Sequence, residues 1–350
     1  MHFVPSRARV GLRVVAITAL GALLLAGCAT NPVASSQLSG TPASSISVPL
    51  SSVGCTFNDV CVALGTSGTT IGPRTVAEFS TPKGRWHNLA LPNTASPLIV
   101  ATACSGSQCL IGGSQSGNDL LWRFSASSHT LSVATPPPGG VGIAALSCDA
   151  VNCAAIDALT TGVPRLSLSA DDGLTWTHPL PMAWARGDAV SSLSCGSALD
   201  CTVSATTPGR HVELFATSDG GLTWSQHPTP SSWTSLSSIT CQLRRCIALA
   251  RTGTTSIVVR SHDFTTTWSS ISLPQLANAL ACSTVTRCVI VGQRTNATPW
   301  LATLIGTTPR DVSLRYVPSP LLDVACGSTV CVAIAVTTLL RVALPLQSGT

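Results

Sequence analysis

The sequence predicts an all-β fold, a seven-bladed β-propeller of four-stranded antiparallel blades, on the basis of three observations. Paired cysteines, with four or five residues between the two members, recur seven times. The first cysteines of successive pairs are 41 to 49 residues apart, which is the length of one four-stranded propeller blade. Short β-rich runs separated by turn residues lie between the pairs, and no segment has the helical period.

The fifth repeat shows the four expected strands most clearly. An alternating run over residues 235–241 ends at the first cysteine of the pair, and the apolar run 246–250 follows the second. Residues 255–260 follow a Thr-Gly-Thr turn, and residues 270–273 come soon after Trp268. Four short strands in succession form the meander from which propeller blades are built.

The cysteine pairs lie where the first strand of each repeat turns into the second. Antiparallel strands with so short a connection bring their ends opposite each other, within reach of a disulfide. We therefore predict one hairpin disulfide per blade, each contributing about 2 kcal/mol by the chain-entropy estimate. The predicted bridges are Cys55–Cys61, Cys104–Cys109, Cys148–Cys153, Cys195–Cys201, Cys241–Cys246, Cys282–Cys288 and Cys326–Cys331.

Metal binding is the alternative use of paired cysteines. Zinc modules usually place cysteines two to four residues apart and bring two pairs, or histidines, together. Here the spacing is wider, the pairs are a full repeat apart, and no histidine recurs with them. Disulfides are typical of exported proteins, so we expect neither a metal nor a cofactor.

The one cysteine outside the pairs, Cys28, indicates the compartment. Arg7, Arg9 and Arg13 precede an apolar run over 14–25 of about a dozen residues, too short for a bilayer span of roughly 20. A Leu-Ala-Gly-Cys sequence then ends at Cys28. These features resemble the bacterial lipoprotein signal peptide and its lipobox. The resemblance implies cleavage before Cys28, a diacylglycerol on its thiol, and export to the outer face of the cytoplasmic membrane; an ordinary secretory signal is the alternative.

The chain divides into residues 1–27 as signal peptide, 28–43 as flexible tether and 44–346 as propeller. The last repeat stops after its third strand. Before the first cysteine, the Ser-Ser-Ile-Ser-Val-Pro segment 44–49 closely matches Ser-Ser-Ile-Ser-Leu-Pro at 269–274, a fourth strand of the fifth repeat. We therefore expect the N-terminal segment to close the last blade as its outermost strand, which would leave no orphan sheet edge.

The charge pattern does not favour nucleic acid as a partner. Of the 19 basic residues three lie in the signal, so 16 remain against 14 acidic residues. No basic run is interleaved with aromatic residues, as nucleic-acid binding would favour. The expected partners are the membrane, through lipidated Cys28, and a protein or cell-wall glycan.

A second motif recurs between the third and fourth strands. Residues 169–176 and 217–224 share the pattern Ser/Thr-x-Asp-x-Gly-x-Thr-Trp, and residues 261–268 keep all but the glycine. The pattern resembles the Asp-box, or bacterial neuraminidase repeat, of sialidases and of non-enzymatic propellers such as photosystem II assembly factors. The aspartate can accept hydrogen bonds from its own turn, the glycine permits positive φ, and the tryptophan packs between blades. These structural residues are Asp171, Gly173, Trp176, Asp219, Gly221, Trp224, Asp263 and Trp268.

Alternating strand directions sort the loops onto two faces. The disulfide hairpins and Asp-box turns share one face, and the second-to-third loops and blade connections share the other. In propellers of the resembling families the second face commonly holds the binding or active site. Loop tryptophans beside arginines could stack on a sugar or anchor a protein there, although Trp184 and Trp233 could instead cover blade edges. The candidate binding residues are Trp184, Arg186, Asp188, Arg210, Trp233 and Arg294.

Signals for catalysis are weak. The sialidase resemblance implies an arginine triad, a tyrosine nucleophile with a glutamate partner, and an acid/base aspartate. The chain has one tyrosine, Tyr316, and two glutamates, Glu78 and Glu213, which fall in predicted third strands. Asp188 and Asp323 are the nearest channel-side aspartates, whereas glycoside hydrolysis needs two carboxylates set across a sugar. We therefore assign no catalytic residue and favour a non-catalytic binding or assembly module over a divergent sialidase-like glycoside hydrolase.

Overall fold

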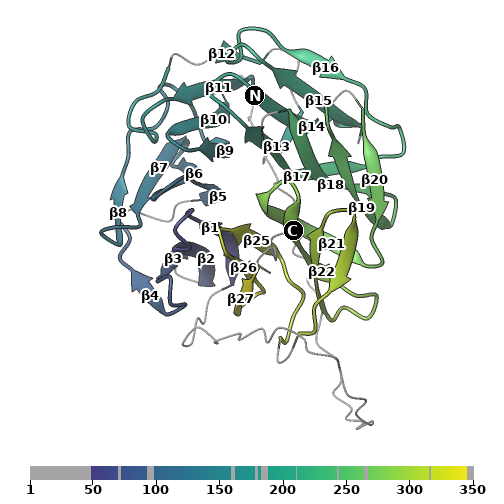
Figure 1. Ribbon diagram of the computed structural model, residues 1–350. Coiled ribbons are helices and arrows are strands. Elements are labelled where there is room, and N and C mark those ends of the chain that lie inside the picture. Colours follow the sequence, from purple (N-terminus) through teal and green to yellow (C-terminus); the bar gives the residue numbers. More distant parts are fainter. Residues whose placement is uncertain are drawn as a thin grey trace.

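The computed structural model describes residues 49–69, 72–92, 98–158, 162–177, 180–182, 188–209, 211–242, 244–263, 267–314 and 317–344. These residues form seven antiparallel sheets arranged in one ring (Figure 1), which confirms the predicted seven-bladed propeller. No helix occurs in this described part, and so no helix there is long and apolar enough to cross a membrane.

Strand order within each blade follows chain order from the ring centre outward. Blades one to three comprise β1 (Leu50–Cys55), β2 (Cys61–Thr69), β3 (Gly72–Ser80), β4 (Trp86–Leu89); β5 (Leu98–Cys104), β6 (Gln108–Gln115), β7 (Asn118–Ser125), β8 (Thr130–Val133); and β9 (Ile143–Asp149), β10 (Asn152–Ala158), β11 (Pro164–Ser169), β12 (Leu180–Pro181). Blades four to seven comprise β13 (Ala189–Cys195), β14 (Cys201–Thr206), β15 (Val212–Thr217), β16 (Ser225–His227); β17 (Ser235–Gln242), β18 (Arg245–Thr252), β19 (Thr255–Ser261), β20 (Ser269–Ser272); β21 (Leu276–Thr284), β22 (Arg287–Gln293), β23 (Pro299–Ile305), β24 (Thr308–Asp311); and β25 (Asp323–Cys326), β26 (Val330–Ile334), β27 (Leu339–Ala343).

Blade seven has three strands in the described part of the chain, and the other six blades have four. The segment that resembles 44–49, Ser269–Ser272, is a fourth strand as predicted. Residues 44–48 themselves lie outside the described residues, as do Cys28, the predicted signal peptide 1–27 and the tether 28–43. Closure of blade seven by the N-terminal segment therefore stays a prediction.

The first strand of every blade lies at the ring centre. Each of these strands contacts the first strand of the next blade, in the order β1, β5, β9, β13, β17, β21 and β25, and β25 contacts β1 again. The hydrophobic core consists of clusters between neighbouring blades. One such cluster joins Val62 and Phe79 of blade one to Ile111 and Trp122 of blade two. Adjacent sheets thus bury their faces against each other around the whole ring.

All seven predicted disulfides are present. In every blade the two cysteines are paired directly across the hairpin between the first and second strands. Their Cα atoms are 3.9–4.1 Å apart. The separation is slightly below the usual range for disulfides of about 4.4–6.8 Å, and in every blade the two residues are directly opposite each other in the antiparallel pair.

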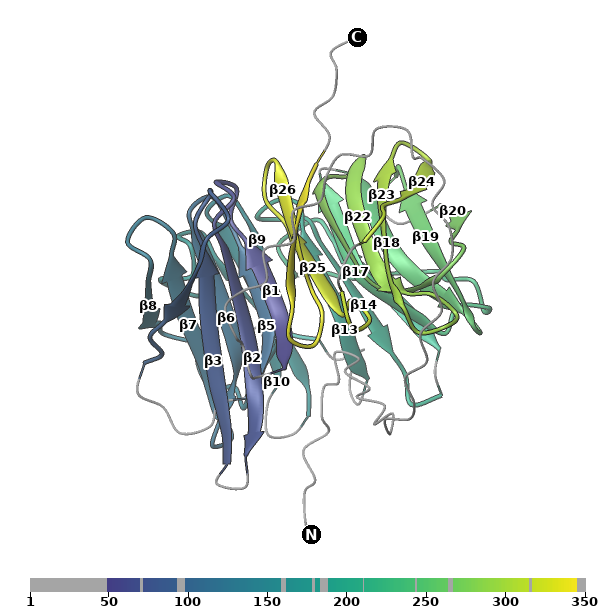
Figure 2. The same cartoon turned by 90° about the horizontal axis from the view of Figure 1, so that it is seen from below.

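The two predicted faces are confirmed, and Figure 2 shows the strands running between them. We call the face with the disulfide hairpins the staple face and the opposite face the loop face. Backbone hydrogen bonds join the hairpin to the third-to-fourth turn of the same blade, from Asp172 N to Val151 O (2.9 Å) and from Gly220 N to Leu199 O (3.0 Å). The second-to-third loops and the blade connections lie at the other ends of the strands, on the loop face.

Serine side chains in the first strands join neighbouring blades. Ser192 accepts a hydrogen bond from Ile239 N (3.1 Å) of the next blade, and Ser238 accepts one from Leu280 N (3.3 Å). Each serine lies three residues before the first cysteine of its blade, and each donor lies two residues before the next blade's first cysteine. Such side-chain acceptors satisfy inner-strand N–H groups that no further strand can pair.

Asp323 occupies the same position in blade seven and accepts a hydrogen bond from Val53 N (3.2 Å) of blade one. Its other oxygen accepts from Val324 N (2.9 Å). Burial raises the pKa of this carboxyl to about 6, against a weaker lowering by the two N–H donors. We therefore expect the blade-seven-to-blade-one junction to be sensitive to pH, unlike its serine counterparts.

The Asp323→Ser variant should lose that pH sensitivity. Because the folded-state pKa lies above the ordinary value of 3.8, the unfolded state releases its proton first, and the carboxyl lowers stability as pH rises from about 4 to about 6. Serine keeps the acceptor without the charge. We expect the variant to be more stable than wild type at pH 7 by about 1–3 kcal/mol, after allowing for partial exposure. Urea unfolding at a series of pH values measures the difference.

The reciprocal Ser192→Asp variant is the matched control. It should acquire the loss of stability between pH 4 and 6, because it places a carboxyl at the equivalent inter-blade position. Parallel pH profiles for wild type and Asp323→Ser would show that Asp323 does not titrate in this range.

Candidate functional site on the loop face

The Asp-centred turns predicted from sequence are built as expected and belong to the staple face. Asp171 accepts hydrogen bonds from Thr175 N (2.9 Å), Thr175 Oγ1 (2.5 Å) and Ser169 Oγ (2.7 Å). These bonds lower the pKa of Asp171 to about 2, and the matching bonds do so for Asp219 and Asp263. All three carboxylates are thus committed to their own turns, which indicates a structural role.

The predicted glycines and tryptophans of these turns are structural too. Gly173 and Gly221 have φ values of 76° and 87°, a conformation that favours glycine. Trp176 donates its indole N–H to Thr135 O (3.1 Å) of the preceding blade connection. Trp224 and Trp268 pack against the clusters between blades.

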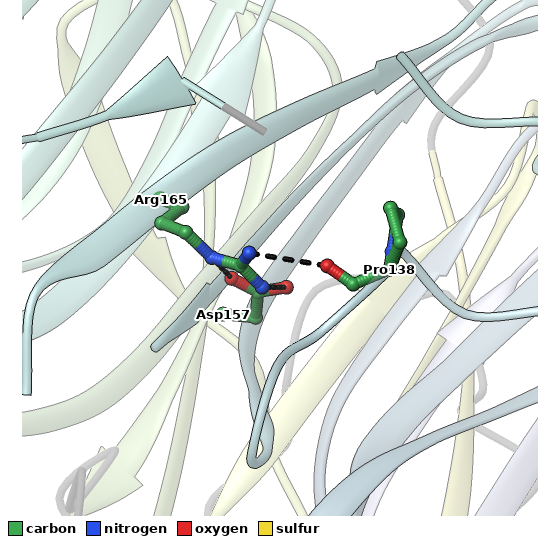
Figure 3. A network of polar contacts seen from close by, with 3 residues as sticks. All are labelled: Pro138, Asp157 and Arg165. Atoms are coloured by element: carbon green, nitrogen blue, oxygen red, sulfur yellow. Dashed lines mark hydrogen bonds and ion pairs between the residues drawn. The ribbon is translucent and has the colours of Figure 1, made fainter. Parts of the chain in front are cut away.

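A buried charged cluster lies between blades two and three at the loop face. Arg165 of β11 donates two hydrogen bonds to Asp157 of β10, from Nε (2.8 Å) and from Nη2 (2.7 Å). Its Nη1 donates to Pro138 O (3.1 Å) of the β8–β9 connection (Figure 3). Both side chains are almost fully buried. The Arg165–Asp157 ion pair therefore anchors the Pro-Pro-Pro-Gly-Gly connection to strands β10 and β11 of blade three.

Asp119 of β7 approaches this pair from blade two. Both of its carboxyl oxygens are buried, and neither has a donor in good hydrogen-bond geometry among the described residues. Its carboxyl also fills the space beside Gly140, where a Cβ atom would lie 2.0 Å from Oδ2. The glycine is therefore required by this close approach.

The close approach of the Asp119 and Asp157 carboxyls requires that they share a proton. Two carboxylates cannot hydrogen bond, whereas a carboxylic acid donates to a carboxylate. Burial, together with the charge and hydrogen bond of Asp157, raises the pKa of Asp119 to about 8, against a lowering by Gly142 N–H and Arg165. Burial also raises the pKa of Asp157, but the Arg165 fork favours its ionised form. At neutral pH the proton is therefore on Asp119.

Asp188 and Glu213 form a second carboxyl pair, on blade four. Burial raises the pKa of both groups, and the neighbouring Asp188 raises that of Glu213 further, against a lowering by His211. The two carboxyls are close enough for each to shift the pKa of the other. Glycosidases instead hold their carboxyls about 5 Å or more apart, across the sugar. Neither pair has that arrangement.

An open groove of about 660 Å³ lies on the loop-face side of blade six. Arg294 stands at one side of it, directly after β22, and residues 312–314 and 317–318, which follow β24, line the other. Val312, Leu314 and Val317 form apolar walls that pack on the core below. The lining residues are Arg294, Thr298, Pro299, Val312, Ser313, Leu314, Val317 and Pro318.

Arg294 forms an exposed ion pair at the rim of this groove. Its Nη2 lies 3.2 Å from Asp311 Oδ2, with the side chains 39% and 47% exposed. Asp311 is held from below, because its Oδ1 accepts the indole N–H of buried Trp300 (2.9 Å). Exposed pairs of this kind contribute little stability, about 0–1 kcal/mol. Arg294 is therefore available to a ligand at small cost.

The predicted binding-face residues do not form one site in the described structure. Arg294 lines the groove, and Asp188 lies directly before β13 on the loop face. Trp184, Arg186 and Arg210, like Tyr316, lie outside the described residues. Glu78 is buried in the third strand β3, as the sequence predicted.

The interpretation of Trp233 as a binding residue is wrong. Its side chain is 5% exposed and packs edge-on against Trp268, with 5.9 Å between ring centroids. A loop tryptophan beside a sheet edge gains more from burial between blades than from exposure to water, so it covers the edge as the alternative interpretation proposed.

Sequence reasoning missed Asp119, Asp157 and Arg165. One signal was present, because Asp157 ends the otherwise apolar run Cys153-Ala-Ala-Ile of a second strand in a chain with few charges. A charge in such a strand is rarely buried without a partner. The identity of that partner required the structure.

No family model matches the chain, and no curated protein matches it. Solved propellers resemble its fold: YCF48 bound to a D1 peptide has a TM-score of 0.59 at 14% identity, covering 93% of this chain and 99% of that one. Virginiamycin B lyase from Staphylococcus aureus, with quinupristin, has a TM-score of 0.60 at 10% identity, covering 88% and 99%. A GH74 enzyme of Niastella koreensis has a TM-score of 0.58 at 12% identity, covering 88% of this chain and 53% of its own. At these identities the likeness shows the fold alone, a seven-bladed propeller.

Substitutions should separate the roles of the two carboxyls in the blade-two cluster. Asp157→Asn leaves the buried Arg165 without its counter-charge and should cost about 3–5 kcal/mol of unfolding free energy. Asp119→Asn keeps a donor toward Asp157 and carries no charge, so the fold should be retained. The variant should also lack the fall in stability that Asp119 causes between its ordinary pKa of 3.8 and about 8. Urea unfolding from pH 4 to 9 measures both effects, and equal destabilisation by the two substitutions would contradict a proton on Asp119.

Proposed function

We propose that this protein is a non-catalytic binding or assembly module that holds an extended segment of a protein partner on its loop face. The observation that carries this proposal is the open groove on blade six, with apolar walls and one available arginine. Binding sites are typically concave and apolar with a few placed polar groups, and this groove combines those features.

A protein segment fits the groove better than a cell-wall glycan does. The described lining residues include no aromatic ring on which a sugar could stack, whereas Val312, Leu314 and Pro318 offer aliphatic contacts. YCF48, which resembles this chain in fold, was solved with a peptide bound. A propeller of this architecture can therefore serve as a peptide receptor, and we assign the same class of partner here.

The charge at Arg294 defines the ligand further. A carboxylate on the partner, from an acidic side chain or a chain terminus, can replace the exposed Asp311 as the counter-ion of Arg294. Arginine holds a carboxylate through two parallel hydrogen bonds, so it would fix the position of an otherwise apolar segment. We therefore propose a ligand with aliphatic residues and one carboxylate.

The glycoside hydrolase alternative gains no support from the described carboxyls. In both pairs each carboxyl is close enough to shift the pKa of the other, and Asp157 of the Asp119 and Asp157 pair is bound to buried Arg165. Neither pair lines the groove.

Selection of peptides from a display library against the full chain tests the proposal. Enriched peptides should be apolar with one carboxylate, and Ser313→Trp should abolish their binding by filling the groove from an exposed position. Arg294→Glu should weaken binding roughly tenfold or more, and replacing the peptide carboxylate by lysine should partly restore affinity for that variant. Ser128→Trp, exposed on a distant turn, is the control and should bind normally. Enrichment of peptides that bind the Ser313→Trp variant equally well would contradict the proposal.

The lipid anchor completes the proposed function, and only the sequence supports it. Cys28→Ser should abolish incorporation of a labelled fatty acid and move the protein from the membrane fraction to the medium. Labelling that persists in this variant, or a wild-type protein without label, would contradict lipidation. Cys28 belongs to none of the seven disulfides, so the Cys28→Ser variant keeps every bridge of the wild-type protein. Loss of folding therefore does not confound the comparison.

A further inference from the structure

Large apolar side chains are exposed at the tips of the staple face. Turns usually carry polar residues, yet Leu222 and Phe57 are 73% and 69% exposed at such tips. Blades three and four together contribute four of these side chains. The exposed apolar tip residues are Phe57, Val151, Leu174, Leu199, Leu222 and Ile305.

The apolar tips continue into a hollow between blades two and three. This second hollow has a volume of about 360 Å³, and exposed Val133 and Leu174 are among its lining residues. Single exposed aliphatic residues are ordinary, but their concentration on one face marks an interaction surface. No core contact requires Leu222 or Leu174 to be apolar, because both point from turns that the Asp-centred hydrogen bonds already fix.

The staple face also distributes its net charge unevenly between two sectors. The tips of blades three and four carry Asp149, Asp171, Asp200 and Asp219, and their described residues include no basic side chain. The hydrogen bonds within the turns keep Asp171 and Asp219 ionised, with the pKa of each at about 2. We call the tips of blades three and four the acidic sector.

Exposed cations lie on other blades of the same face. Arg244 and Arg245 occupy the β17–β18 hairpin of blade five, and Lys83 and Arg85 occupy the β3–β4 turn of blade one. Phe57 and Ile305 provide exposed apolar groups on this side, from blades one and six. The same tips also carry Asp59 and Asp263, whose carboxylates accept hydrogen bonds from Thr329 and Thr267, so these tips are basic in net charge and not free of acidic groups. We call these tips of blades five, six and one the basic sector.

We propose that two copies of this chain associate through their staple faces, with the acidic sector of each copy against the basic sector of the other. A two-fold axis places the same surface on both partners, so a face that carries both charge signs on separate sectors is complementary to itself. The exposed aliphatic side chains would be buried in the contact, and the paired charges would fix its register. The loop faces of both copies point outward, so the dimer would present two binding grooves.

Sedimentation velocity over a range of concentrations tests the proposal on the full chain, secreted as the unlipidated Cys28→Ser form. A reversible monomer–dimer equilibrium is expected, and its dissociation constant should rise with salt because charges contribute. Leu222→Asp and the double variant Arg244→Glu/Arg245→Glu should each weaken association roughly tenfold or more. They act on opposite sectors, so an effect of both identifies a self-complementary contact.

Leu98→Asp is the matched control, because Leu98 is 60% exposed at the loop-face end of β5. This variant should dimerise like the parent, and circular dichroism should show that all variants retain the fold. A protein that stays monomeric at every concentration would overturn the proposal. So would a dimer that Leu222→Asp leaves intact, or one that Leu98→Asp disrupts equally.

Discussion

The junction between blade seven and blade one is the contact on which the rest of the molecule depends, because a ring positions its faces only when it is closed. Asp59, at the tip of the β1–β2 hairpin, accepts hydrogen bonds from Thr329 N (3.1 Å), Thr329 Oγ1 (2.5 Å) and Val330 N (3.2 Å) of blade seven. On the loop face, Leu50 N donates to Val336 O (2.8 Å). The junction is thus held at both ends of the inner strands, and Asp323 holds it between them.

Two kinds of connection, one covalent and one polar, then make the ring rigid. Each disulfide closes a hairpin within one blade, and serine acceptors such as Ser192 and Ser238 connect one blade to the next. The disulfides and the Asp-centred turns both occupy the staple face. The groove on blade six is formed on the loop face instead, by the β22–β23 loop and by the described residues 312–314 and 317–318 that follow β24.

The spacing of cysteines predicted the blade number, the strand order and every disulfide, because a covalent hairpin bridge leaves a regular mark on the sequence. The Asp-centred turns could also be predicted from the sequence, because Asp171 forms hydrogen bonds only with residues within four positions of itself. The charged cluster could not be predicted from the sequence, because Asp119 and Asp157 come from different blades and meet only in the folded ring. Burial of Trp233 depended on the same packing between blades. Sequence alone placed Arg294 on the loop face but did not predict the apolar residues that line the same groove.

Hydrogen exchange at the closing junction tests the central claim, a ring closed through Asp59 and Asp323, most directly. The amides of Val53, Thr329 and Val330 should exchange as slowly as those of buried second strands such as β14, because opening the junction requires opening the ring. Their protection should fall selectively in an Asp59→Ala variant while β14 stays protected. Fast exchange of these amides in the wild-type protein would contradict closure by these contacts.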